Sequence, residues 1–210
     1  MSGARALYRF DERWVASSAD TPVIAGVDEA GRGPLAGPVV AAAVVFRRPV
    51  FLKKLNDSKK LSPKTRESLF KEIAAHAHVG IGRVSESVID EINILQATRL
   101  AMREAVLALP RTPGLLLIDG KIKLDLPLRQ AAIIRGDGRS AVIAAASIMA
   151  KVFRDHWMKG LDFLYPDYRF KLHKGYPTPE HLRILEEKGA SPVHRRTFRP
   201  VRESLEESRP

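Results

Sequence analysis

The sequence predicts a single α/β domain, in which short buried strands are combined with amphipathic helices. Its 210 residues fit one domain, and a content of 45% hydrophobic and 28% charged residues is typical of a globular protein. Several short apolar runs are spaced along the chain, and longer segments with helical periodicity lie among them. The core is therefore expected to mix strands and helices.

The predicted strands are short apolar runs that are mostly rich in β-branched residues. Runs at 23–27 and 39–46 are separated by the glycine- and proline-rich segment AGRGPLAGP, and a third run lies at 79–84. The run at 114–120, GLLLIDG, ends in a lone carboxylate, as expected of a buried strand that delivers an acid to its carboxyl end. Residues 131–134, followed by Arg-Gly-Asp, repeat that arrangement.

The predicted helices begin at recognisable start signals. Ser62 followed by Pro63 marks one start, because serine can cap free amide groups and proline fits the first turn. A long helix is predicted after Ser87 and up to Pro110 and an alanine-rich one over 140–159, both with apolar residues near helical spacing. A short helix is predicted over 179–188.

The chain divides into a tail, a domain and an extension. We expect residues 1–20 to form an N-terminal tail and residues 21–206 a single domain. The last part of that domain, residues 160–206, is an extension rich in aromatic, proline and basic residues. The N-terminus does not read as a secretory signal, no apolar run is long enough to cross a bilayer, and cysteine is absent from the sequence. These features favour a cytoplasmic protein.

The charge balance points to a polyanionic partner. Lys and Arg number 35 against 24 Asp and Glu, a net charge of +11. Two segments, 47–72 and 169–202, concentrate basic residues, and the second interleaves aromatic rings that could stack on sugars or bases or could instead form an aromatic minicore. Those aromatic residues are Tyr168, Phe170, Tyr176 and Phe198. The histidines nearby lack a regular metal spacing and are expected to be structural or to contact phosphate. They are His173, His181 and His194.

Acidic residues follow three of the predicted strands. Asp28 and Glu29 come after VIAGV, Asp119 after LLLI and Asp137 after AAIIRG. Strand ends at one edge of a sheet converge, so acids that are distant in sequence can meet there. Adjacent side chains on a regular strand point to opposite faces, so the first two can share a site only if the strand breaks between or just after them.

Carboxylates gathered in this way indicate a metal site. They would repel one another unless divalent cations neutralised them, and oxygen ligands suit magnesium or manganese. Two such ions can hydrolyse a phosphodiester without a nucleophilic side chain, so a metal-dependent nuclease is predicted. The alternative is a non-catalytic RNA-binding or architectural protein whose acids merely cap helices and begin turns, as Asp125, Asp155 and Asp162 are expected to do.

The glycines of GRGPLAG superficially resemble a dinucleotide-binding turn. The spacing is wrong, however, prolines occupy the expected helix start, and the preceding acids would repel a pyrophosphate. A loop whose main chain approaches a nucleic-acid strand, with Arg32 reaching a phosphate, is one interpretation. A plain tight turn is the other.

Five segments in this order together resemble bacterial ribonuclease HII. They are GVDEAGRGPLAGP, NDSKKLS, LLIDG, IIRGD followed by AAASIMAKVFRD, and HKGYPT, and the resemblance spans about Val23 to Arg202. It implies a ribonuclease-H-like fold with a mixed five-stranded sheet flanked by helices and a helical C-terminal extension. It also implies a monomeric endonuclease that cuts the RNA strand of RNA–DNA hybrids and cuts 5′ to single ribonucleotides in duplex DNA, leaving 3′-hydroxyl and 5′-phosphate ends.

The resemblance also implies roles for individual residues. The metal-binding and catalytic acids are Asp28, Glu29, Asp119 and Asp137, holding Mn²⁺ or Mg²⁺. The main chain of Gly31, Arg32 and Gly33 is expected to sense the 2′-hydroxyl, and Tyr176 to stack on the following sugar. Lys59 and Lys174, in the NDSKKLS and HKGYPT segments, are expected to bind the substrate. The related ribonuclease HIII has a sizeable N-terminal domain ahead of its first acids. Here only 27 residues precede Asp28, so we do not expect a ribonuclease HIII.

Overall fold

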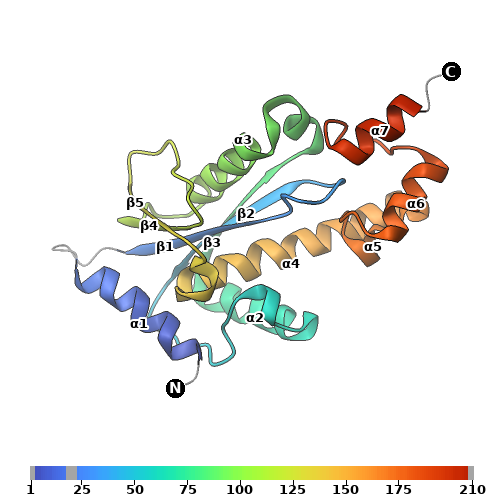
Figure 1. The fold of residues 1–210 in the computed structure, drawn as a ribbon. Coiled ribbons are helices and arrows are strands. Elements are labelled where there is room, and N and C mark those ends of the chain that lie inside the picture. The colour runs from blue at the N-terminus through green and yellow to red at the C-terminus, as the bar shows by residue number, and fades with distance from the viewer. Residues whose placement is uncertain (1–2, 18–22, 208–210) are drawn as a thin grey trace.

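The computed structural model describes residues 3–17 and 23–207, which form one mixed β-sheet with helices on both faces (Figure 1). The strands are β1 (Ile24–Ala30), β2 (Val39–Phe46), β3 (Ala77–Val84), β4 (Leu115–Asp119) and β5 (Arg129–Ile133). The helices are α1 (Gly3–Ala16), α2 (Pro63–His76), α3 (Glu86–Leu107), α4 (Ala141–Leu164), α5 (Phe170–His173), α6 (Pro179–Lys188) and α7 (Arg199–Glu207). This confirms the predicted mixed five-stranded sheet.

The sheet has the order β3-β2-β1-β4-β5. β1 pairs antiparallel with β2 and parallel with β4, and β5 continues in parallel with β4. β2, whose sequence is VVAAAVVF, is buried along nearly its whole length because helices cover both of its faces. The predicted strand at 23–27 is longer than expected and includes both acids that follow it.

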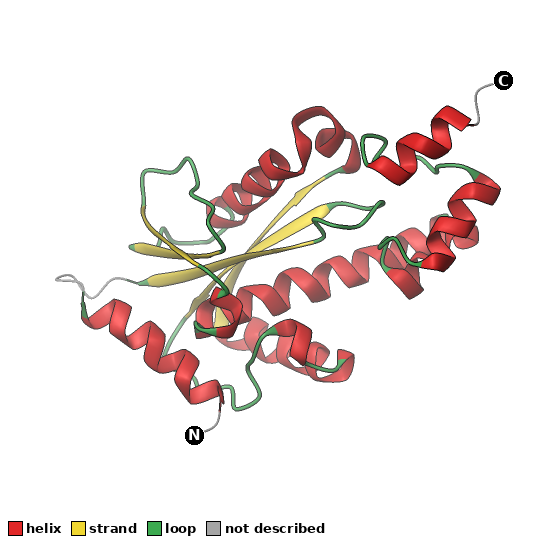
Figure 2. Ribbon diagram, viewed as in Figure 1, coloured by secondary structure: helices red, strands yellow, loops and turns green. Residues whose placement is uncertain are grey.

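Helix α3 covers one face of the sheet, and α4 covers the other together with α2 and α1 (Figure 2). α4 lies very close to β1, because Gly26 has no side chain: a Cβ there would fall 2.1 Å from the carbonyl carbon of Val142. α3 is bent at Asn93, where φ is 66°, whereas the periodicity predicted an unbroken helix. The two long helices fix the sheet edge where the acids lie.

The start of α2 follows the predicted signal, and α4 begins at Ala141, next to its predicted start at 140. Ser62 caps α2 by accepting a hydrogen bond from the Thr65 amide, with proline in the first turn. Ser140 caps α4 by accepting from the Ile143 amide. α4 runs to Leu164, five residues beyond its predicted end of 159, because no residue in that stretch interrupts the helix.

The expectation that residues 1–20 form a tail is wrong for the part that the structure describes. Residues 3–16 form α1, which buries Ala4 and Leu7 against the face covered by α4. Asp11 accepts a hydrogen bond from the Val142 amide at the start of α4. The charged residues between its apolar positions obscured this amphipathic pattern. Residues 18–20 of the predicted tail lie outside the described residues.

The predicted helical extension is confirmed. It consists of the end of α4, a 3₁₀ turn at Pro166–Tyr168, and α5, α6 and α7. An isolated bridge between Ala36 and His194 joins it to the loop after β1. No helix among the described residues is both long enough and apolar enough to cross a membrane.

We expect Leu7→Ala to lower the free energy of unfolding by about 2–4 kcal/mol, because it leaves a cavity between α1 and the core. Urea denaturation followed by circular dichroism measures the change. Arg5→Ala is the control, since Arg5 is exposed on the same helix. A loss for Leu7→Ala no larger than that of the control would show that α1 does not belong to the cooperative unit.

Candidate active site

The parallel pairing of β1 and β4 brings two aspartates together. Val27 pairs with Ile118, so the next residues along the two strands, Asp28 and Asp119, lie side by side on the same face. Asp28 is buried, with 5% of its surface exposed, and its Oδ1 accepts a hydrogen bond of 2.8 Å from the Glu29 amide. The strand-end pattern correctly predicted this juxtaposition.

Glu29 joins these two aspartates at the end of β1. The strand continues to Ala30 and turns at Gly31, just after the acids, so the required break is present. The carboxylate of Glu29 lies 3.5 Å from the guanidinium of Arg32. Asp28, Glu29 and Asp119 line one cavity of about 250 Å³.

Asp137 lies next to this cavity rather than in its lining. It stands in the 3₁₀ turn at Gly136–Gly138 and lines a neighbouring cavity of about 610 Å³. Lys59 lines both cavities, and its Nζ lies 3.5 Å from Oδ2 of Asp137. The Gly136 amide donates a 2.6 Å hydrogen bond to Oδ1 of Asp119, which holds the turn against the end of β4.

The acids of this site disfavour one another's ionisation. Burial raises the pKa of Asp28 well above its ordinary value, and the charges of Glu29 and Asp119 raise it further. Burial also raises the pKa of Glu29, with Arg32 opposing and Asp119 adding to the rise. For Asp137, burial and then the charge of Asp119 raise the pKa, against the neighbouring lysine.

This concentration of negative charge fits a divalent cation. All the donors are carboxylate oxygens, which suit hard ions such as Mg²⁺ or Mn²⁺, and a cation would relieve the repulsion that raises the pKa values. Among residues 3–17 and 23–207, no group of three or more His, Cys, Asp or Glu side chains is already spaced to hold a metal ion. The fit therefore rests on donor chemistry and charge.

The expected substrate-binding residues are divided between this cavity and its surroundings. Gly31, Arg32, Gly33 and Lys59 line the cavity, as does Tyr176, whose surface is 40% exposed. A methyl group at Gly33 would lie 3.8 Å from Cε1 of Tyr176, so this loop and the ring are neighbours. Lys174 is not part of the lining, and its Nζ turns back to the carbonyl of Lys171.

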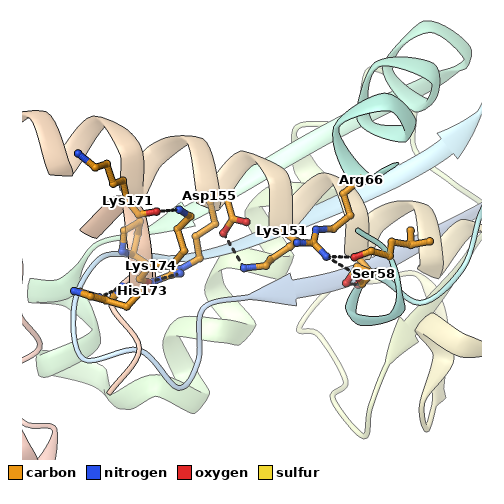
Figure 3. Close-up of polar contacts among 12 residues, drawn as sticks. Ser58, Arg66, Lys151, Asp155, Lys171, His173 and Lys174 are labelled. Carbon is orange, nitrogen blue, oxygen red and sulfur yellow. Dashed lines mark hydrogen bonds and ion pairs between the residues drawn. The ribbon is translucent and has the colours of Figure 1, made fainter. Parts of the chain in front are cut away.

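The cavity is also lined by four polar residues that the sequence interpretation did not select: Ser58, Arg66, Ser147 and Lys151. The two serine hydroxyls lie 2.9 Å apart, and Arg66 donates to the carbonyl of Ser58. Figure 3 shows Lys151 on α4 paired with Asp155, with Arg66 on one side and Lys174 on the other. Ser147 could have been noticed as a lone polar residue in the apolar run AVIAAASIMA.

The interleaved aromatic residues mostly form a minicore, which was the alternative interpretation. The rings of Tyr168 and Phe170 are stacked with centroids 5.5 Å apart, and Phe170 is fully buried. Phe198 is partly buried against the core. Tyr176 is therefore the member of this set that faces the cavity.

The three histidines are structural and support the segment before α6. His173 and His181 are stacked at 4.2 Å, and Nε2 of His181 lies 3.0 Å from Nε2 of His194. Nδ1 of His181 is 2.9 Å from the carbonyl oxygen of Tyr176. Burial lowers the pKa of His181 to about 4, and burial together with the charge of His181 lowers the pKa of His194 to about 3.

Comparison with known proteins identifies relatives over most of the chain. The family model described as Ribonuclease HII matches residues 25–201. A Ribonuclease HII of Geobacillus kaustophilus is 55% identical over 186 residues, which are 88% of this chain and 71% of that protein. The ribonuclease H2 of Pyrococcus horikoshii aligns with a TM-score of 0.75 at 29% identity, covering 88% of this chain and 97% of that one.

A further solved structure has the same fold. Bst-RNase HIII, in a crystal structure in complex with Mn²⁺, aligns with a TM-score of 0.70 at 20% identity, covering 88% of this chain and 70% of that one. These structural neighbours give the sheet and its helices the ribonuclease-H-like fold that the sequence predicted.

We expect the histidine pair to make the protein less stable in acid. The folded pKa values lie below the unfolded value of 6.5, so their stabilisation is present above pH 6.5 and is lost as the pH falls toward 4 and 3. Burial raises the pKa of Asp11 to about 6, which acts in the opposite direction. The test therefore compares how steeply the free energy of unfolding changes with pH in wild type and in a histidine variant.

Urea denaturation of wild type and His194→Gln at pH 7.5, 6.5 and 5.5 measures that difference. The free energy of unfolding of wild type should fall more steeply with decreasing pH than that of the variant, because the variant has one buried imidazole fewer to protonate. Parallel pH profiles would contradict the assignment.

Proposed function

This chain belongs to the ribonuclease HII family and is a ribonuclease H nuclease of RNA–DNA hybrids; we propose that it also cuts 5′ to single ribonucleotides embedded in duplex DNA. Cleavage breaks the bond between phosphorus and the preceding 3′-oxygen, forms a bond from phosphorus to a water oxygen, and protonates the leaving oxygen. The products are a 3′-hydroxyl and a 5′-phosphate, as needed to begin ribonucleotide excision repair.

One observation carries this proposal: three carboxylates, the Gly31–Gly33 main chain and Tyr176 line the same cavity. The carboxylates supply negative oxygen for cations, the glycine loop allows close approach of a strand, and the ring can stack on a sugar. The 2′-hydroxyl is the group that distinguishes a ribonucleotide from its DNA neighbours, so it has to be read at short range.

Asp28, Glu29, Asp119 and Asp137 are the proposed catalytic residues and metal ligands. Divalent cations bound there, Mn²⁺ or Mg²⁺, would lower the pKa of a water and stabilise charge on the leaving oxygen. Asp28 and Asp119 provide the central oxygen donors, and Glu29 and Asp137 complete the set and orient water. The complex of Bst-RNase HIII with Mn²⁺ supports the choice of metal.

The remaining residues have proposed roles in holding the duplex. The main chain of Gly31, Arg32 and Gly33 contacts the 2′-hydroxyl, and Tyr176 stacks on the sugar that follows. Lys59, whose side chain is 82% exposed beside Asp137, contacts phosphate. Lys174 is proposed to contact the continuing strand beyond the cavity, because Figure 3 shows it near Lys151, which lines the cavity.

Residues 21–206 are the proposed catalytic unit, with residues 160–206 as the part that contacts the substrate beyond the cavity. One chain supplies every residue named above, so we propose a monomeric enzyme. Its proposed substrates are RNA–DNA hybrids and DNA duplexes that contain ribonucleotides, so its action is proposed for the cytoplasm. Family membership excludes the alternative of a non-catalytic RNA-binding or architectural protein.

We expect the wild-type protein to cleave an RNA–DNA hybrid and a duplex with one embedded ribonucleotide, but not an all-DNA duplex. Cleavage should stop in EDTA and return with added Mn²⁺ or Mg²⁺. Asp119→Asn should lower the rate at least about 100-fold, because it removes a charged donor from the centre of the site. Gel analysis of end-labelled duplexes measures product and cut position.

Asp125→Asn is the matched control, since Asp125 is exposed on the segment after β4. It should cleave at the wild-type rate. Cleavage by Asp119→Asn at a rate near that of wild type would show that the acids are misassigned, and an uncut single-ribonucleotide duplex would remove the proposed repair activity.

We expect Tyr176→Ala to reduce kcat/KM for the single-ribonucleotide duplex about 10-fold or more while the fold is retained, because the stacking surface beside the sugar is lost. Tyr176→Phe keeps the ring and should remain close to wild type. The two variants are compared by steady-state kinetics and thermal melting. Equal effects of the two substitutions would assign the role to the hydroxyl instead.

A further inference from the structure

Two arginine side chains are buried behind the loop of residues 31–37, called the glycine loop below. Arg154 on α4 is 1% exposed, and Arg195, after the bridge to the loop, is fully buried. Among the described residues, every hydrogen bond from their guanidinium groups goes to a main-chain carbonyl. Burial lowers the pKa of Arg154 to about 10 and that of Arg195 to about 9. Burying a charge costs free energy unless the charged group is fully hydrogen-bonded, so these hydrogen bonds are expected to matter for the loop.

Arg195 binds both ends of the glycine loop. Its Nη2 donates to the carbonyl of Gly31 at 2.6 Å and to that of Gly37 at 2.7 Å, and its Nη1 donates to the carbonyl of Arg32 at 3.0 Å. Its own amide donates to the carbonyl of Leu35. A planar guanidinium can satisfy such a set of acceptors in one fixed geometry.

These contacts determine where the next N–H groups point. In a trans peptide the carbonyl and the following N–H point in opposite directions, and the described chain contains no cis bond. Because the carbonyls of Gly31 and Arg32 face Arg195, the N–H groups of Arg32 and Gly33 face away from it. Neither N–H has an acceptor among the described residues.

Arg154 supports the loop from the adjacent position. Gly31 has φ of 97°, and a Cβ there would fall 2.1 Å from Nε of Arg154, so only glycine fits over this side chain. Arg154 also donates to the carbonyls of Ala36 and Lys174, which ties the loop to the segment that carries Tyr176.

We propose that Arg195 is a positioning residue for ribonucleotide selectivity: by holding the carbonyls of Gly31 and Arg32, it aims two successive main-chain N–H groups at the substrate's 2′-hydroxyl. The inference rests on the proposed function and deepens it. The N–H groups lie on a loop that lines the cavity with Asp28 and Tyr176. Without the guanidinium, the loop would have to order itself on binding, and the hydroxyl contact would weaken.

The test separates selectivity from folding. Wild type, Arg195→Lys and Arg195→Gln are titrated in EDTA with two labelled duplexes of one sequence, one all-DNA and one with a single ribonucleotide, and Kd is measured by fluorescence anisotropy. We expect wild type to prefer the ribonucleotide duplex about 5-fold to 10-fold, as one or two hydrogen bonds would give. Both variants should bring the ratio of the two Kd values close to one.

A purely structural role for Arg195 would weaken binding to both duplexes equally and leave the ratio unchanged, which would overturn the inference. Met102→Ala is the control for lost stability, because Met102 is fully buried on α3 at the other face of the sheet. It should keep the wild-type ratio. A wild type that does not prefer the ribonucleotide duplex would count against the proposed function itself rather than against Arg195 alone.

A second measurement uses the wild-type protein and so stands even if the variants fail to fold. In ¹⁵N-labelled protein, the amide signals of Arg32 and Gly33 should shift on addition of the ribonucleotide duplex. They should shift less with the all-DNA duplex. Equal shifts with both duplexes, in a protein that prefers the ribonucleotide, would show that these N–H groups do not read the hydroxyl.

Discussion

The parallel pairing of β1 with β4 is the constraint on which the candidate site depends. It places Asp28 and Asp119 on the same face at the same level, and Glu29 follows where β1 ends. Their mutual repulsion in a half-buried cavity opposes folding, so the surrounding structure has to hold the strands firmly. The close approach of α4 at Gly26 and the covered faces of the sheet provide that support.

Features that are set by residues close together in the sequence could be predicted from it. The strands, the Ser62 cap and the acids at strand ends follow from local sequence signals and from the rule that strand ends converge. The helix at 3–16 was missed because it has no continuous apolar run, although apolar residues recur along it at helical spacing. The bend at Asn93 was missed because no glycine or proline marks it.

The buried arginines lie beyond such reasoning for a different reason. Arginine is normally exposed, and in a list of charges Arg154 and Arg195 look like part of a basic surface. Apart from the carbonyl of Lys174, their partners are carbonyl groups of residues 31–38, more than one hundred positions earlier, and only the assembled fold brings them together. The histidines differ, because their partners are mainly one another and main-chain groups that are close in sequence, and no regular spacing marks such a cluster.

The hydrogen bond from the Gly136 amide to Asp119 has a consequence for genetics. Asp119 both faces the cavity and anchors the turn that carries Asp137, so the two positions are not independent. A change at Asp119 would release its neighbour as well, and the loss seen in a double variant would be smaller than the two single losses combined. This pair should therefore show epistasis, because a second substitution removes an arrangement that the first has already disturbed.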